Sequence, residues 1–400
     1  MPPSTSLWPR ILSLVGGALG LVFALYSTLD YAQHLDRRLH DLHCSFVPGA
    51  PATGDAEACR AAMYSPYSAI LKEQYWGGIP ISLFALGAFA FLTGFALYLL
   101  LSGPRAPRST VVFFAVVSLT PLVVSAVMFT ISVTKVGALC KTCVGIYAAS
   151  FLLAAGGVFG LTTAPRFEAR GAPLAAALPL AWLVLLALTT LVPAVVYASA
   201  VPDHRAYLTQ CGELKQPVEK HDALVKLRTP SSIQPATLFE DPLCPTCQAF
   251  HDRLVGEDVF DKLDVRLVLF PLDSECNWML DAPLHPGACI VSKAVLCGAD
   301  RAREVLEWAY DEQVYLTRAG KAGPGVLKEV IRRRWGESLT ACLDQRETEL
   351  RLNQHLHFAS DNSIPVSTPQ AYLGKRRICD EDTDIGLRYT LAELAPEVLR

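Results

Sequence analysis

The chain has 400 residues, enough for two or three domains, and its 35 lysines and arginines nearly balance its 38 aspartates and glutamates. This near-neutral charge argues against a nucleic-acid-binding protein. Hydrophobic residues make up 52% of the chain and the mean hydropathy is +0.31, which together indicate membrane-spanning segments.

Five uncharged apolar stretches lie in the first half of the chain, each close to the length of about 20 residues that a helix needs to cross a bilayer. They predict transmembrane helices at 11–29, 79–101, 111–133, 144–162 and 174–197. A signal peptide is the alternative for the first stretch, but the apolar region of a signal peptide is usually shorter, about 7 to 15 residues.

Five crossings place three parts of the chain on one side of the membrane: the loop at 30–78, the hairpin at 134–143 and everything after 198. All twelve cysteines then share that side, which suggests an oxidising compartment where disulfides persist. The opposite side receives two short loops that carry arginines, as the positive-inside rule expects. Basic residues also fall on the outer side, so the positive-inside rule supports this orientation only weakly. The placement of all cysteines on one side is the stronger argument for it.

Two cysteine pairs accompany these helices. Cys140-Lys-Thr-Cys143 lies where the third and fourth helices meet, and a thiol at a helix start feels the positive end of the helix dipole, which favours the thiolate. A structural disulfide or a metal clip is the alternative, but no His or Met lies nearby in sequence to complete a metal site. Cys44 and Cys59 lie in the first loop, where a pair on its own is more often a staple.

The sequence after the fifth helix becomes mixed in charge and polarity, which predicts a linker over 199–235 and a soluble domain over 236–400. A predicted strand at 236–240 leads into Asp241-Pro-Leu-Cys244-Pro-Thr-Cys247 and then a helix. A CxxC motif that follows a strand and opens a helix matches thioredoxin-like redox sites, where the first thiol is exposed and acidified.

The rest of this domain alternates between strand and helix patterns. Helical periodicity covers 288–360, with a break at Gly323-Pro-Gly325. The other predicted elements are a second strand at 265–270, a strand at 370–373, a strand near Arg377 and a final helix from Leu391.

Six further cysteines are expected to be structural staples, and six cysteines allow 15 pairings, so the connectivity stays open. They are Cys211, Cys276, Cys289, Cys297, Cys342 and Cys379. Cys276 and Cys289 are the best candidates for a local bridge. His285, just before Cys289, is interpreted as a surface-loop histidine and not as a metal ligand.

The order of several motifs resembles the vitamin K epoxide reductase family, in its bacterial form fused to a thioredoxin-like domain. The first loop carries Cys44 and Cys59, then Ser65-Pro-Tyr-Ser68 and Gly78-Ile-Pro80, and Tyr147 follows Cys143 by one turn. Ser367-Thr-Pro369 similarly resembles the Thr-cisPro loop of the thioredoxin superfamily, and the helical insertion resembles its DsbA-like branch. The segment between Cys44 and Cys59 is long for the family.

The resemblance implies a fold of two parts: a membrane four-helix bundle within residues 1–172 with a fifth linking helix at 173–198, and an α/β thioredoxin-like domain with a helical insertion. It also implies a quinone, either ubiquinone or menaquinone, in the bundle, bound near Cys143, Tyr147 and Ser82. The implied catalytic residues are Cys44, Cys59, Cys140, Cys143, Cys244, Cys247 and Pro369.

These residues imply a quinone-dependent thiol oxidase in the bacterial inner membrane, with its redox sites facing the periplasm. Its partners would be secreted or periplasmic cysteine-containing proteins, membrane lipid and the quinone, with no nucleic acid. The alternative is a membrane-anchored thioredoxin-like reductase or isomerase. A reductase that imports electrons needs cysteines near the inner face, which this sequence lacks, and a simple anchor has no use for two additional cysteine pairs.

Overall fold

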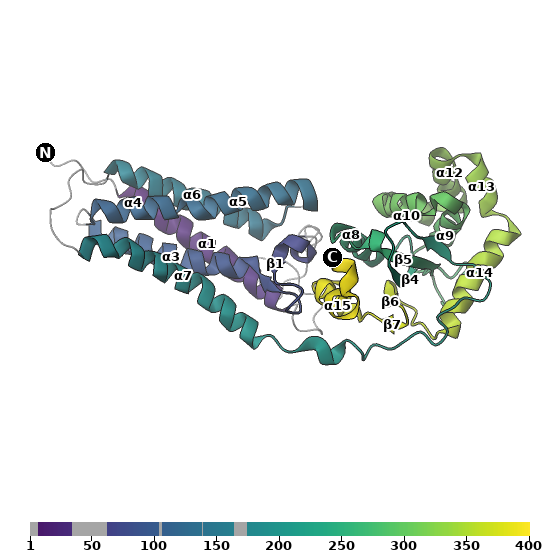
Figure 1. The fold of residues 1–400 in the computed structure, drawn as a ribbon. Coiled ribbons are helices and arrows are strands. Elements are labelled where there is room, and N and C mark those ends of the chain that lie inside the picture. The colour runs from purple at the N-terminus through teal and green to yellow at the C-terminus, as the bar shows by residue number, and fades with distance from the viewer. Residues whose placement is uncertain (1–6, 34–61, 104–105, 138, 164–173) are drawn as a thin grey trace. The chain divides into compact units, whose positions relative to one another are not determined.

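The computed structural model describes residues 7–33, 62–103, 106–137, 139–163 and 174–400. The chain divides into two compact units, Met1–Pro202 and Asp203–Arg400, the first made of long helices and the second built around a sheet (Figure 1).

Long apolar helices dominate the described part of the first unit. They are α1 (Trp8–Gln33), α3 (Ile81–Ser102), α4 (Arg108–Val117), α5 (Leu119–Ile131), α6 (Lys141–Thr163) and α7 (Leu174–Ala200). Among the described residues, five helical spans are long and apolar enough to cross a membrane, with α4 and α5 sharing one of them. The five apolar helices predicted from the sequence are therefore confirmed.

The third span is not one continuous α-helix, as the sequence predicts, but is interrupted at Ser118 between α4 and α5. Pro121 has no N–H to donate to the carbonyl of Val117, four residues earlier. The Thr120 hydroxyl takes this role and donates to Val117 O at 2.7 Å. The same span ends in a π-helical turn over Ser132–Val136, before Gly137 in the left-handed region.

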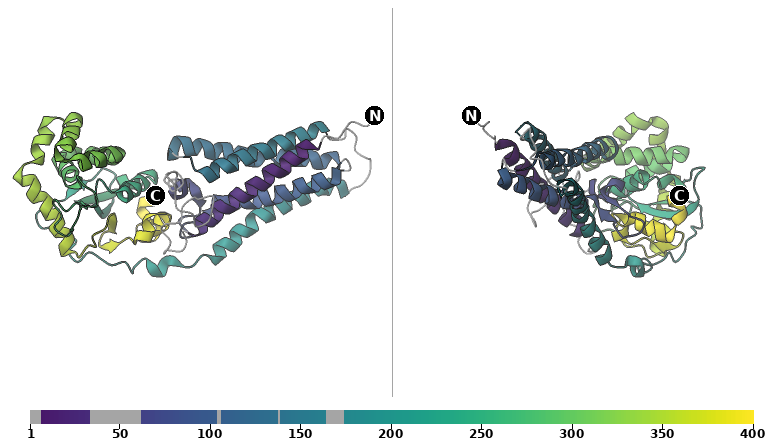
Figure 2. Two further views of the ribbon diagram at one scale, coloured as in Figure 1. Left: turned by 180° about the vertical axis from the view of Figure 1, so that it is seen from behind. Right: turned by 60° about the vertical axis from the view of Figure 1, so that its left-hand side comes forward.

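Helix α1 runs the length of the bundle and packs against both α6 and α3, while α7 packs against α3 (Figure 2). Glycines on α1 allow this close approach, as small residues do in membrane helices. A Cβ on Gly16 would lie 2.5 Å from Leu153 N of α6. Between α3 and its neighbours, Phe95 stacks on Phe114 with ring centroids 5.6 Å apart and meets the edge of Trp182 at 5.1 Å.

The second unit contains a five-stranded sheet in the order β3-β5-β4-β6-β7. Only β4 and β5 pair in parallel, through the crossover that contains the CxxC helix, and the other pairs are antiparallel. The strands are β3 (Val225–Leu227), β4 (Gln234–Glu240), β5 (Leu263–Leu269), β6 (Gln370–Leu373) and β7 (Arg376–Arg377).

A helical insertion separates β5 from β6, and within it α9 packs against α10, α12, α13 and α14. Gly323, with a φ of +123°, ends α11 and precedes α12, as predicted. The last helix begins at Leu387, four residues before the predicted start. The helices are α8 (Pro245–Gly256), α9 (Ala288–Cys297), α10 (Ala302–Asp311), α11 (Gln313–Ala322), α12 (Pro324–Trp335), α13 (Glu337–Leu343), α14 (Arg346–Asp361) and α15 (Leu387–Leu394).

The segment before β4 differs from the linker predicted over 199–235. β3 pairs along the edge of β5, and Leu214 N donates to Lys375 O at 2.8 Å. Leu214 and Leu224 are buried, so removing this segment would expose apolar surface. Residues from 203 onward therefore belong to the second unit, and α7 leads almost directly into it.

Three disulfides staple the second unit, as expected for the six remaining cysteines. The local bridge Cys276–Cys289 is the one predicted, whereas the pairs Cys211–Cys379 and Cys297–Cys342 could not be assigned from sequence. Cys211–Cys379 ties the segment before β3 to the chain after β7, and Cys297–Cys342 joins the ends of α9 and α13.

Candidate functional site

The CxxC motif of the second unit begins helix α8 directly after strand β4. Cys244 is the N-cap residue of α8, and Cys247 lies in its first turn. Pro245 suits the first helical position because the N–H that it lacks would have no partner there. The Asp241 carboxylate accepts Leu243 N at 2.8 Å, and the Asp241 carbonyl accepts Cys244 N at 3.0 Å, which fixes the turn between strand and helix.

The two thiols of this motif have very different environments. A hydrogen bond from the Cys247 thiol lowers the pKa of Cys244 to about 5, with help from Thr246, whose Oγ1 lies 2.9 Å from Cys244 Sγ. Complete burial raises the pKa of Cys247 well above its usual range, and the Cys244 thiol adds to this effect. Cys244 therefore has the environment of a thiolate and Cys247 that of a protonated thiol.

The loop before β6 lies against this motif. The peptide bond between Thr368 and Pro369 is cis, and Thr368 O lies 3.6 Å from Cys244 Sγ. The Thr246 hydroxyl also donates to Thr368 O, at 3.1 Å. The structure thus brings Pro369 and the CxxC motif together across more than 120 residues of sequence.

A buried carboxyl group at the end of β4 was not predicted from the sequence. Glu240 is 1% exposed and accepts a hydrogen bond from the Tyr310 hydroxyl of α10 at 2.9 Å. Burial raises the pKa of Glu240. Its negative charge, when present, disfavours the Cys247 thiolate. No local pattern marks this pair, because Tyr310 comes from the insertion.

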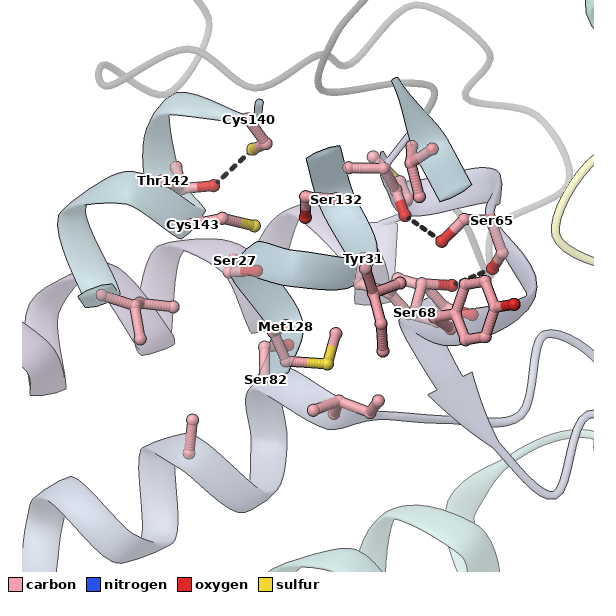
Figure 3. Close-up of a pocket in the computed structure, with 18 of the residues that line it drawn as sticks. Ser27, Tyr31, Ser65, Ser68, Ser82, Met128, Ser132, Cys140, Thr142 and Cys143 are labelled. Carbon is pink, nitrogen blue, oxygen red and sulfur yellow. Dashed lines mark hydrogen bonds between the residues drawn. The ribbon is translucent and has the colours of Figure 1, made fainter. Parts of the chain in front are cut away.

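In the first unit, a cavity of about 140 Å³ is lined by side chains of α1, α3, α5 and α6 and by the segment around Ser65 (Figure 3). An engineered apolar cavity of roughly 150 Å³ in another protein binds benzene, so this one has room for a six-membered ring. Its apolar lining residues include Met63, Ile81, Ala85, Val124, Met128, Ile131 and Ile146. Its hydroxyl groups come from Ser27, Tyr31, Ser65, Tyr67, Ser68, Ser82, Ser125, Ser132, Thr142 and Tyr147.

Cys140 and Cys143 both line this cavity. Cys140 precedes α6 and its Sγ lies 2.9 Å from Thr142 Oγ1, and Cys143 lies in the first turn of the helix. Tyr147 follows one turn later, with its hydroxyl 3.5 Å from Ser132 Oγ at the start of the π-helical turn. The structure therefore gathers this cysteine pair and Tyr147 at one cavity.

The opposite wall contains Ser82, whose hydroxyl accepts a hydrogen bond from Thr28 at 3.0 Å. Lys72 is 5% exposed, and its ammonium donates to Ser65 O at 2.6 Å, which holds the Ser65–Ser68 turn in place. The Tyr31 hydroxyl donates to Gly77 O. Tyr31, Met128 and Ser132 were missed by sequence reasoning, because nothing in an apolar helix marks which face borders a cavity.

Cys44 and Cys59 lie outside the described residues, so their relation to either site stays a prediction. Among the residues that the structure describes, no cluster of three or more His, Cys, Asp or Glu side chains could hold a metal ion.

The fold and these two dithiol centres define a multi-pass membrane thiol-disulfide oxidoreductase. Residues 11–156 match the vitamin K epoxide reductase family, which is the family that the motifs of this part of the chain resemble. No curated protein sequence matched the chain.

Solved structures of other proteins are similar to about half of this chain. Reduced DsbA1 from Neisseria meningitidis is 17% identical, with a TM-score of 0.34, over 46% of this chain and 92% of that chain. A thioredoxin-like oxidoreductase from Silicibacter pomeroyi is 16% identical, with a TM-score of 0.28, over 41% and 87%. ScsC from Proteus mirabilis in a transitional conformation is 13% identical, with a TM-score of 0.28, over 55% and 99%.

Proposed function

We propose that this protein is a quinone-linked thiol oxidase of the bacterial inner membrane, which forms disulfides in secreted proteins. Electrons pass from client thiols to Cys244 and Cys247, then to Cys44 and Cys59, and finally to Cys140 and Cys143. The observation that carries this proposal is the ring-sized cavity lined by the membrane cysteine pair.

The cavity fits a quinone ring in size and in chemistry. Most of the cavity surface is apolar, and hydroxyl groups of Ser82 and Tyr147 offer hydrogen bonds to ring carbonyls. A quinone held there would act as the oxidant, because it can accept two electrons and two protons. The chain's own contribution is to position Cys143 and to hold the ring beside it.

The client step follows from the thiol environments of the second unit. A client thiolate attacks Cys244 of the Cys244–Cys247 disulfide, a bond forms to Cys244, and Cys247 leaves with the electron pair. A second client thiolate then attacks the client sulfur, which completes the client disulfide and releases Cys244 as a thiolate. Because the pKa of Cys244 is about 5, it is a good leaving group, and the reduced form is stabilised, which favours oxidation of clients.

The next two steps are exchanges of the same kind. The Cys244/Cys247 dithiol reduces a Cys44–Cys59 disulfide, and the resulting dithiol reduces a Cys140–Cys143 disulfide. In each step two electrons pass to the next cysteine pair, and the pair that gives them up becomes a disulfide again. The placement of all twelve cysteines in segments on one predicted side of the membrane supports a periplasmic location for this relay.

The proposal is tested by quinone reduction with the purified full chain, supplied with a reduced dithiol peptide. Cys143→Ser should abolish quinol formation, while exchange between the peptide and Cys244 persists. Thr130→Ser, at an exposed position of α5 outside the cavity, should reduce quinone at the wild-type rate. Retained quinone turnover in the Cys143→Ser protein would remove this cysteine from the mechanism.

A further inference from the structure

The buried carboxylate of Asp241 links the CxxC turn to a loop 44 residues later. Asp241 is 0% exposed, and its Oδ1 accepts Leu243 N at 2.8 Å. Its Oδ2 accepts Leu272 N at 2.8 Å and lies 2.7 Å from His285 Nδ1. Its backbone N–H points at Cys247 Sγ, at 3.4 Å. Asp241 therefore contacts both the redox turn and His285.

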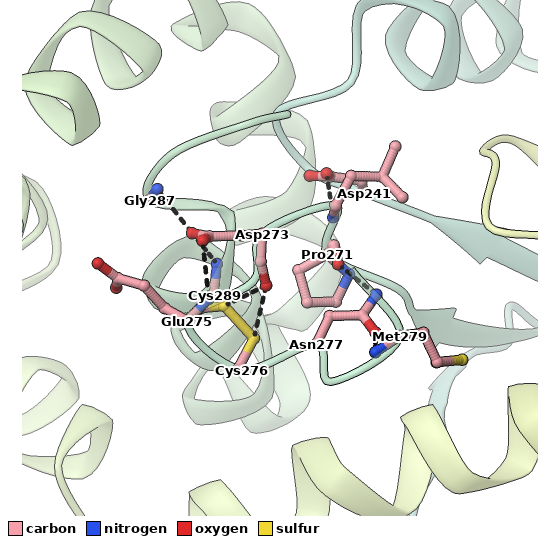
Figure 4. Close-up of a disulfide and its surroundings, with 10 residues drawn as sticks. Asp241, Pro271, Asp273, Glu275, Cys276, Asn277, Met279, Gly287 and Cys289 are labelled. Atoms are coloured by element: carbon pink, nitrogen blue, oxygen red, sulfur yellow. Dashed lines mark hydrogen bonds between the residues drawn. A yellow bond between two sulfur atoms is a disulfide. The ribbon is translucent and has the colours of Figure 1, made fainter. Parts of the chain in front are cut away.

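The loop that carries His285 is fixed at several points. The Cys276–Cys289 disulfide closes it, and the buried Asp273 carboxylate accepts Gly287 N at 2.8 Å (Figure 4). The backbone N–H of His285 donates to Leu272 O at 2.9 Å. These contacts hold the imidazole in one position against Asp241.

His285 can exchange protons with solvent, because its side chain is 20% exposed. An ionised carboxylate can only accept hydrogen bonds. In this pair Nδ1 of His285 is therefore the protonated atom, and its N–H donates to Asp241. This hydrogen bond raises the pKa of His285, and the negative charges of Asp241, Cys244 and Asp273 raise it further. Burial of the ring lowers this pKa, but by less. Three titratable groups thus act on the ring: Asp241 and Cys244 from the CxxC turn, and Asp273 from the loop after β5.

We propose that His285 is a positioning residue for the redox centre, whose imidazolium, held on Asp241, stabilises the Cys244 thiolate. His285 lies in a loop and is partly exposed, as the sequence indicated, but its pairing with the buried Asp241 carboxylate was not predicted. The inference rests on the proposed thiol exchange at Cys244 and is independent of the quinone step.

Coupling between two charged groups is reciprocal. If the Cys244 thiolate favours the imidazolium, the imidazolium favours the thiolate by the same free energy. Oxidation to a disulfide removes the thiolate charge, so His285 should bind its proton more weakly in the oxidised protein. Below the pKa of His285 the reduced form is stabilised and the disulfide is the stronger oxidant. This stabilisation fades as the pH rises through that value.

The first test uses only the wild-type full chain. The pKa of each histidine is measured by hydrogen–deuterium exchange at imidazole C2, read by peptide mass spectrometry, in the reduced and oxidised protein. His285 should have the higher pKa in the reduced protein, whereas the pKa of the exposed His221 should be the same in both redox states. Equal values for His285 in both redox states would overturn the proposal.

The second test compares His285→Asn with His221→Asn in the full chain. Asparagine keeps an N–H donor near Asp241 but carries no charge. The midpoint for alkylation of Cys244, followed on its own peptide, should rise by roughly one pH unit in His285→Asn, as loss of a neighbouring positive charge predicts. His221→Asn should keep the wild-type midpoint. An unchanged midpoint in a folded His285→Asn protein contradicts the proposal, whatever the quinone assay shows.

Discussion

At the scale of single residues, His355 shows how burial fixes one protonation state. It is 0% exposed on α14, its Nδ1 accepts Leu269 N at 2.9 Å, and its Nε2 donates to Ala223 O at 2.9 Å. The contact at Nδ1 requires the neutral ring, because a protonated Nδ1 could not accept a hydrogen bond. Desolvation lowers the pKa of His355 to about 4.

This depressed pKa predicts acid destabilisation of the second unit. The unfolded chain binds a proton near pH 6.5 and the folded chain only near pH 4, so stability is present above pH 6.5 and is lost as the pH falls to 4. The loss should amount to about 3 kcal/mol. His355→Gln should flatten the pH dependence of the free energy of unfolding in this window, measured by denaturant titration. The exposed neighbour His357→Gln should leave it intact, and an equal slope in both variants would refute the assignment.

The chemistry of single residues was predictable where a short sequence motif carries it. The spacing of Cys244 and Cys247 after a strand predicted a redox site at a helix start, and the structure places Cys244 at the N-cap of α8 and Cys247 in its first turn. The pairings of Asp241 with His285 and of Glu240 with Tyr310 were not predictable. Each joins residues from separate elements, and a single sequence contains no signal for such contacts.

At the scale of elements, hydropathy located the membrane helices because a bilayer demands long apolar runs. It missed the interruption at Ser118, although Pro121 was a signal for it. It also missed β3, whose three residues are too few to show an alternating pattern. Because β3 was missed, the sequence analysis assigned this segment to a linker, although it belongs to the sheet domain.

Close packing between α1 and α6 depends on Gly16. A Cβ there would lie 2.5 Å from Leu153 N and 2.9 Å from Leu153 Cα, and backbone atoms cannot move aside as a flexible side chain can. Gly16→Ala should therefore destabilise the bundle by about 1–3 kcal/mol, the usual cost of overpacking. The midpoint of thermal unfolding in detergent should fall. The matched control is Gly94→Ala on α3, where a Cβ would meet nothing within 4 Å, and an equal fall in both variants would contradict this account.

At the scale of the whole molecule, one chain joins a helical domain that matches the vitamin K epoxide reductase family to a sheet domain that carries a CxxC motif. The order of the two was predictable from composition and motifs, whereas the start of the second unit at Asp203 was not. A covalent tether can present one redox centre to another at an effective concentration in the millimolar range. The relay proposed above depends on this advantage.

The most direct test of that relay is to remove the resolving thiol. Without Cys247, a mixed disulfide formed by Cys244 cannot be released from within the motif, so Cys247→Ser should accumulate a bond from Cys244 to Cys44 or Cys59. Cys59 is the expected partner, which leaves Cys44 to reach Cys140. Non-reducing peptide mapping by mass spectrometry should find this bond within one chain, in a yield that does not change on dilution. If Cys244 is found bonded only to other secreted proteins and never to the first loop, the two domains do not form one electron path.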